Sequence, residues 1–194
     1  EFRRVLFLST VLGREGMLEA AVDKDFGEQK ILETTLDSNS ELGQYLEKIR
    51  SNPEMMGKVL DELPASAKRD KTFMLALAEI DPAYAMHYAD KDVLKKDEDF
   101  NVRVAALKGK RASGSVLAEM LPEARTEAVV MASLKQDYRN IRYALPQMPS
   151  YDKMLEKAKK AALEKVKDLK ESVDIALLVP KILQKDKEFM AKVE

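Results

Sequence analysis

The segment from Gly109 to Ser115 is the first place where residue types and spacing could do chemistry. Gly109 and Gly114 have the separation of the glycines in a phosphate-binding P-loop. A P-loop also needs a lysine after the second glycine, where this chain has Ser115. It needs a preceding strand as well, whereas residues 102–108 have helical spacing. We therefore predict a turn between helices that binds no nucleotide. Its cations leave an anionic contact with a partner open: Lys108, Lys110 and Arg111.

The single histidine, His87, does not complete a catalytic set. A lone histidine cannot form a histidine-rich metal site, and no serine lies in a Gly-x-Ser-x-Gly motif. The absence of cysteine excludes thiolate chemistry and cysteine zinc sites. Carboxylates are abundant, but the acidic run 97–99 fits a helix N-terminus, where the macrodipole favours negative charge. We therefore predict no catalytic residue, no metal and no cofactor, and we do not expect an enzyme.

Tyrosine and methionine are the residues most suited to contact a partner. The ten methionines have helical spacing, which fits either core packing or an adaptable protein-binding surface. Four tyrosines either pack the helices together or form a shallow aromatic groove: Tyr84, Tyr88, Tyr138 and Tyr143. Together with the cationic turn, these tyrosines make up the candidate contact set for a protein partner.

Charge and hydropathy restrict the kinds of partner. The chain has 33 basic and 34 acidic side chains, interspersed along 194 residues, for a net charge of −1. No excess of positive charge therefore draws it to nucleic acid or anionic lipid. No apolar run approaches the roughly 20 residues that span a bilayer. We expect neither a nucleic-acid nor a membrane partner, and the absence of cysteine is compatible with the cytoplasm.

The spacing of apolar residues predicts an all-α fold. Between the prolines, apolar residues recur every three or four positions, and no segment alternates long enough to indicate a strand. Asp81-Pro82 is an N-cap residue followed by proline at the first helical position. The longest predicted helix covers residues 151–171, with an apolar stripe opposite a charged, solvated face.

A helix opening recurs along the chain. The five residues from Asp70 to Met74 read Asp-Lys-x-Phe-Met, as do those from Asp186 to Met190, and Asp97 is likewise followed by phenylalanine three residues later. A Tyr-Ala pair recurs at 88–89 and 143–144. These marks predict helix pairs of about 24 to 29 residues. Such pairs bury too little alone, so we expect them to stack in an irregular, solenoid-like array.

The predicted units open near Asp70, Asp97, Thr126, Tyr151 and Asp186, and the third of them resembles a known bacterial repeat. Residues 128–137, Ala-Val-Val-Met-Ala-Ser-Leu-Lys-Gln-Asp, are followed by Ile-Arg-Tyr-Ala at 141–144. This pattern resembles the repeat named domain of unknown function 4116, although Tyr138 replaces its turn glycine and residues 109–111 depart from it. The resemblance covers about residues 70–150. It implies a helical repeat, and it brings no activity or catalytic residue.

Three segments are expected along the chain. Residues 1–9 resemble the translation of a sequencing adapter, differing at Leu8; the alternative is a native first strand or helical turn. On the adapter reading the true chain begins near Thr10. We predict an N-terminal helical segment over 10–69 and degenerate repeats over 70–194. The unit that opens at Asp186 has nine residues, so we expect the C-terminus to be truncated.

The sequence predicts a role in binding rather than catalysis. Helical repeats build extended surfaces without a dedicated pocket. We therefore expect a non-catalytic segment that binds another protein, alone or as part of a larger bacterial protein. The alternative is a purely structural spacer between other domains.

Overall fold

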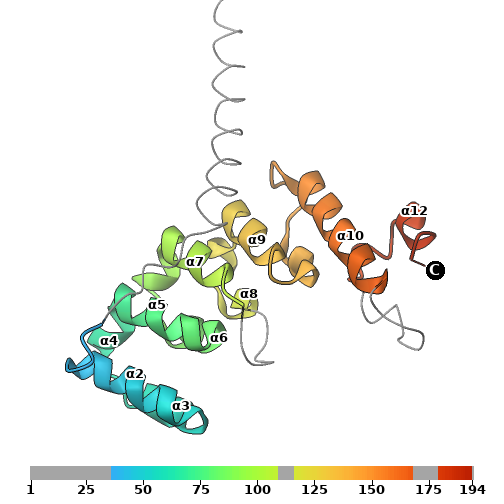
Figure 1. Ribbon diagram of the computed structural model, residues 1–194. Helices are drawn as coiled ribbons and strands as arrows, with labels where there is room; N and C mark the ends of the chain where they lie inside the picture. Colours follow the sequence, from blue (N-terminus) through green and yellow to red (C-terminus); the bar gives the residue numbers. More distant parts are fainter. Residues whose placement is uncertain (1–35, 109–115, 168–178, 194) are drawn as a thin grey trace, which may run out of the picture. The chain divides into compact units, whose positions relative to one another are not determined.

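The computed structural model describes residues 36–108, 116–167 and 179–193, and the regular elements in these ranges are all helices (Figure 1). No strand occurs in the described ranges, which confirms the all-α prediction. The chain divides into two units, residues 1–34 and 35–194. The described elements all belong to the second unit.

Four short helices begin the described chain: α2 (Glu41–Ser51), the 3-10 helix η1 (Pro53–Met55), α3 (Met56–Asp61) and α4 (Ala65–Arg69). Ser40 caps α2, because its Oγ accepts a hydrogen bond of 3.0 Å from the amide of Gly43. Glycine is needed at position 43, since a Cβ there would collide with the carbonyl oxygen of Asp37.

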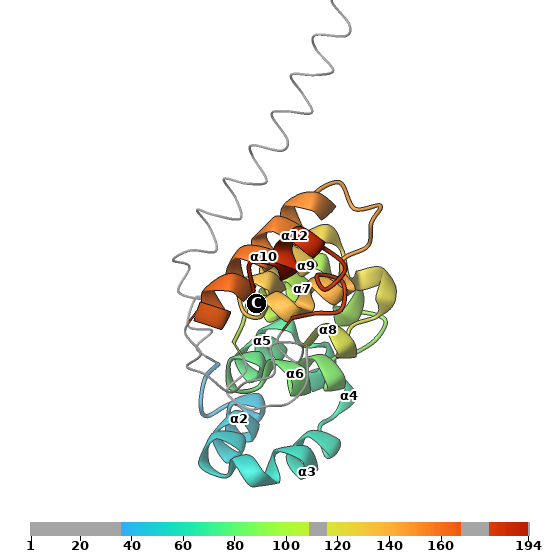
Figure 2. The ribbon, with the colours of Figure 1, turned by 90° about the vertical axis from the view of Figure 1, so that its right-hand side faces the viewer.

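The later helices, in chain order, are α5 (Lys71–Ile80), α6 (Pro82–Tyr88), η2 (Leu94–Lys96), α7 (Glu98–Ala105), α8 (Val116–Glu119), η3 (Pro122–Ala124), α9 (Glu127–Leu134), η4 (Tyr138–Tyr143), α10 (Tyr151–Lys167) and α12 (Lys187–Met190). Helix α7 contacts both α5 and α9, while α8 packs on α6 (Figure 2). Both α9 and η4 contact α10. Successive helices therefore pack on one another, while a solenoid-like array stays a prediction.

The Asp-x-x-Phe openings share one local structure. In each, the aspartate caps a helix: its Oδ1 accepts a hydrogen bond from the amide of the phenylalanine three residues later. The phenylalanine side chain is at the same time buried in the core. The pairs are Asp70 with Phe73 at 2.8 Å, Asp97 with Phe100 at 2.9 Å, and Asp186 with Phe189 at 3.0 Å. The motif therefore starts a helix and anchors it in the core.

The second oxygen of a capping aspartate joins that helix to an earlier one. Lys71 on α5 donates to Oδ2 of Asp97 at 2.8 Å and pairs with Asp99 at 2.9 Å. Lys159 on α10 pairs in the same way with Oδ2 of Asp186 at 2.7 Å. Hydrogen bonds from Lys159 and then from the amide of Phe189 lower the pKa of Asp186. The caps thus take part in packing between helices as well as in starting them.

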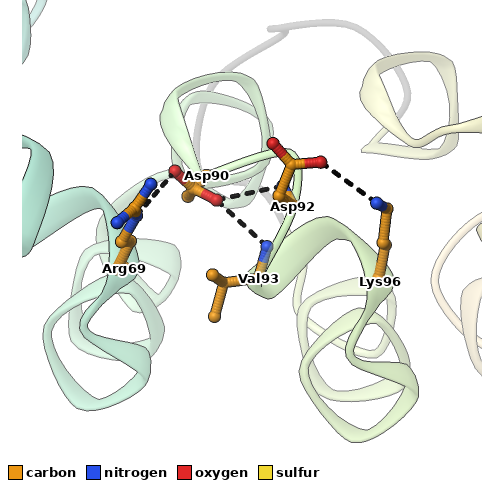
Figure 3. Close-up of polar contacts among 5 residues, drawn as sticks. All are labelled: Arg69, Asp90, Asp92, Val93 and Lys96. Carbon is orange, nitrogen blue, oxygen red and sulfur yellow. Dashed lines mark hydrogen bonds and ion pairs between the residues drawn. The ribbon is translucent and has the colours of Figure 1, made fainter.

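The loop after α6 is held by Asp90 (Figure 3). Its Oδ2 accepts a hydrogen bond of 3.0 Å from Nε of Arg69 on α4, and its Oδ1 accepts bonds of 3.0 Å from the amides of Asp92 and Val93. Despite an opposing effect of desolvation, the hydrogen bond from Arg69 and then those amides lower the pKa of Asp90. The Asp90 carboxylate therefore connects the loop that follows α6 to α4, two helices earlier in the chain.

The longest described helix, α10, confirms the expectation of one long helix from residue 151. It is helical to Lys167, and residues 168–171 lie outside the described ranges. Its buried stripe has a four-residue spacing: Met154, Ala158 and Ala162.

Five methionines of the described ranges are buried in the core: Met56, Met74, Met86, Met120 and Met154. For these five methionines, core packing rather than a protein-binding surface is therefore confirmed.

Candidate functional site

The described contact residues expected from the sequence lie on two helices and at residue 108. Tyr84 and Tyr88 lie on α6, while Tyr138 and Tyr143 begin and end η4. All four tyrosines are half-buried and pack against the core. Lys108 is exposed beside the predicted turn, and two further candidates lie outside the described residues: Lys110 and Arg111.

Helix α6 is fixed at both ends by buried polar groups. Asp81 is fully buried, and its Oδ1 accepts hydrogen bonds from the amides of Ala83 at 3.0 Å and Tyr84 at 3.1 Å. Pro82 follows at the first helical position, as the sequence predicts. At the other end, Nζ of Lys95 donates to the carbonyl oxygen of His87 at 3.1 Å. These contacts hold the seven-residue helix in a defined position.

Three rings at positions 84, 87 and 88 lie on one side of α6, and we name Tyr84, His87 and Tyr88 the α6 face. The rings of Tyr84 and Tyr88, four residues apart, are stacked with centroids 6.3 Å apart and an interplanar angle of 10°. The His87 ring meets Tyr88 edge-on, at 5.0 Å and 72°. Nζ of Lys68 lies 5.5 Å from the centre of the Tyr88 ring. The α6 face therefore presents stacked aromatic rings bordered by a cation.

The hydroxyl of Tyr88 connects this face to α3. It donates a hydrogen bond of 2.7 Å to Oδ1 of Asp61, the last residue of α3. This hydrogen bond, together with desolvation and the negative charge of Asp61, raises the pKa of Tyr88 to about 12. Sequence reasoning misses Asp61 because 27 residues separate the partners and no local motif marks the contact.

Alkaline titration tests the contact between Tyr88 and Asp61. The folded chain retains the Tyr88 proton up to about pH 12, whereas an unfolded tyrosine ionises near pH 10. The contact therefore stabilises the fold below pH 10, and its contribution is lost as the pH rises toward 12. We expect the tyrosinate absorbance to contain a step near pH 12 that Tyr88→Phe removes and Asp61→Ala moves toward pH 10. Glu62→Ala, which removes the neighbouring acid, should leave the step in place. A step near pH 12 that persists in Tyr88→Phe contradicts this assignment.

A group of ionisable side chains lies at the end of α6. Nδ1 of His87 is 2.9 Å from Oε2 of Glu119 on α8, and both side chains are exposed. Lys95 is only 6% exposed, and burial lowers its pKa despite the opposing charge of Glu119. No cluster of three or more His, Cys, Asp or Glu residues in the described part of the chain could hold a metal ion. The exposed histidine–glutamate pair is suited to a surface contact.

Helix η4 holds the second pair of tyrosines. Asp137 caps it by accepting a hydrogen bond of 2.9 Å from the amide of Arg139. Burial raises the pKa of Tyr138. Tyr143 lies beside two guanidinium groups, those of Arg125 and Arg142. Neither arginine belongs to the contact set expected from the sequence: Arg125 follows η3, and Arg142 lies within η4.

Comparisons of the chain with protein-family models, with curated proteins and with solved structures found no match. The resemblance to domain of unknown function 4116 therefore stays a prediction, as does the repeat that it implies. Within the described ranges, no helix is both long and apolar enough to cross a membrane.

Proposed function

We propose that this chain is a non-catalytic helical segment that binds another protein through the α6 face. The supporting observation is the stacked pair of Tyr84 and Tyr88. Tyrosine is enriched at protein interfaces because its ring offers a large rigid contact area and its hydroxyl a hydrogen bond.

The two tyrosines have different parts in this proposal. The hydroxyl of Tyr88 is engaged by Asp61, which fixes the ring against which Tyr84 stacks. The hydroxyl of Tyr84 forms no hydrogen bond with any described residue. Tyr84 is thus held in place by its neighbour, and in this proposal its hydroxyl is the group that hydrogen-bonds to the partner. Such preorganisation lowers the entropic cost of binding.

Substitution of Tyr84 tests the proposal. The full chain is immobilised and exposed to a lysate of its source organism, and mass spectrometry identifies the proteins that it retains. Each retained protein is then purified and titrated calorimetrically against each variant. We expect Tyr84→Ala to weaken binding of a partner by about tenfold or more, as interface tyrosines do. Tyr45→Ala, which removes a half-buried tyrosine from α2, is the matched control and should bind like the wild type.

Circular dichroism of both variants confirms that the helices are retained. If no purified protein depends on Tyr84 for binding while the helices persist, the proposal is wrong, and the structural-spacer alternative is favoured.

A further inference from the structure

Two arginines flank one tyrosine ring beside α9. Cζ of Arg125 lies 5.1 Å from the centre of the Tyr143 ring, and Cζ of Arg142 lies 4.9 Å from it. The two charges are therefore within about 10 Å of each other. We name Arg125, Arg142 and Tyr143 the arginine cluster.

The arginine cluster has no ion pair with a described carboxylate, although the charge of Arg142 contributes to the lowered pKa of Asp137. The nearest acid in sequence to Arg142 on its own helix, Asp137, is engaged by Arg139 through contacts of 2.8 to 3.0 Å. Residues 125–143 hold four basic and two acidic side chains, although the whole chain has a net charge of −1. Positive charge is thus concentrated locally.

Among the described residues, the Arg125 guanidinium is held by one hydrogen bond, and its Nε lacks a hydrogen-bond acceptor. Its Nη2 donates to the carbonyl oxygen of Met120 at 3.0 Å, whereas its Nε is buried and has no hydrogen-bond partner. A guanidinium has five N–H donors, and buried polar groups nearly always find partners. An anion at the outer nitrogens of this guanidinium would leave Nε unpaired, but it would balance a positive charge that no described carboxylate pairs with.

We propose that the arginine cluster binds two carboxylates of an acidic segment in the partner protein. Carboxylates form strong, charge-assisted hydrogen bonds with guanidinium groups. Alternate side chains of an extended segment are about 7 Å apart, and side chains four apart on a helix are about 6 Å apart. Both spacings are shorter than the upper limit of about 10 Å on the separation of the two guanidinium groups. The inference rests on the proposed function, because the acidic segment belongs to a protein partner.

A labelled hexaglutamate peptide tests the inference by fluorescence anisotropy with the full chain. We expect Arg125→Gln to weaken peptide binding about tenfold. The effect of Arg142→Gln should be smaller, about threefold, because the Arg142 side chain is exposed. Arg50→Gln, which removes an exposed arginine paired with Glu47 on α2, controls for net charge and should have no effect. Tyr143→Phe retains the ring and should bind like the wild type, whereas Tyr143→Ala should bind more weakly.

Three results would overturn the inference. The first is equal peptide binding by the wild type and the Arg125→Gln/Arg142→Gln double variant, and the second is an equal loss in Arg50→Gln. The third is displacement of hexaglutamate by inorganic phosphate at a lower concentration than by unlabelled peptide, which would assign the cluster to a phosphate. Because the peptide titration does not involve Tyr84, its failure is distinguishable from failure of the proposed function.

Discussion

Replacement of Phe100 by alanine is expected to lower the free energy of unfolding by about 3 to 5 kcal/mol. The Phe100 side chain is 0% exposed and lies in the first turn of α7, which packs against both α5 and α9. Truncation removes buried apolar area and leaves a cavity that two neighbouring helices would have to fill. Urea unfolding followed by circular dichroism measures the loss.

Two further substitutions serve as comparisons for the loss in the free energy of unfolding. Phe100→Leu retains most of the apolar volume and should cost less than Phe100→Ala. Val93→Ala removes methyl groups from a residue that is 47% exposed, so we expect a change within about 0.5 kcal/mol. A loss below about 1 kcal/mol for Phe100→Ala would show that α7 is not packed as described.

Replacement of Asp97 by alanine is expected to cost about 2 kcal/mol, because this carboxylate serves two contacts. Loss of the N-cap accounts for most of the cost, since it leaves the amide of Phe100 without its acceptor. Loss of the partly exposed ion pair with Lys71 adds a smaller amount. Asp97→Asn retains a capping oxygen, so it should cost less than Asp97→Ala in the same urea experiment.

The Asp97 contacts also predict a pH dependence. Burial alone would raise the pKa of Asp97, but hydrogen bonds from Lys71 and from the amide of Phe100 outweigh it and lower the pKa. The contribution to stability is therefore present above about pH 4 and lost as the pH falls through the folded-state pKa. We expect the stability of Asp97→Ala to fall less steeply with acid than that of the wild type. Equal slopes would contradict the assignment.

The features that could be predicted from the sequence are local. A capping aspartate and the phenylalanine three residues later lie in one helical turn, so their spacing alone predicts both the cap and the buried anchor. The start of α6 at Asp81-Pro82 could be predicted for the same reason, because the N-cap and the proline are adjacent in the sequence. Thr126 shows the limit of such patterns: it forms no side-chain cap and instead donates to Oε1 of Glu98 at 2.9 Å, a residue 28 positions earlier.

The candidate sites depend on contacts between helices, which spacing does not reveal. The hydrogen bond from Tyr88 to Asp61 spans 27 residues, and Arg125 meets Tyr143 only because η4 packs on α9. The excess of basic residues over 125–143 was visible in the sequence, but its relation to a ring was not. Lys110 and Arg111, in the segment between two glycines, lie outside the described residues.

A capping aspartate and a buried phenylalanine together start α5, α7 and α12, and both α5 and α7 pack against α6. Amide hydrogen exchange at Phe100, measured by NMR in the wild type and in Asp97→Ala, tests this central claim most directly. We expect a protected Phe100 amide in the wild type and exchange at least about tenfold faster in Asp97→Ala, with a smaller acceleration at the Phe73 amide. An unprotected Phe100 amide in the wild type, or equal rates in the two proteins, would contradict the claim.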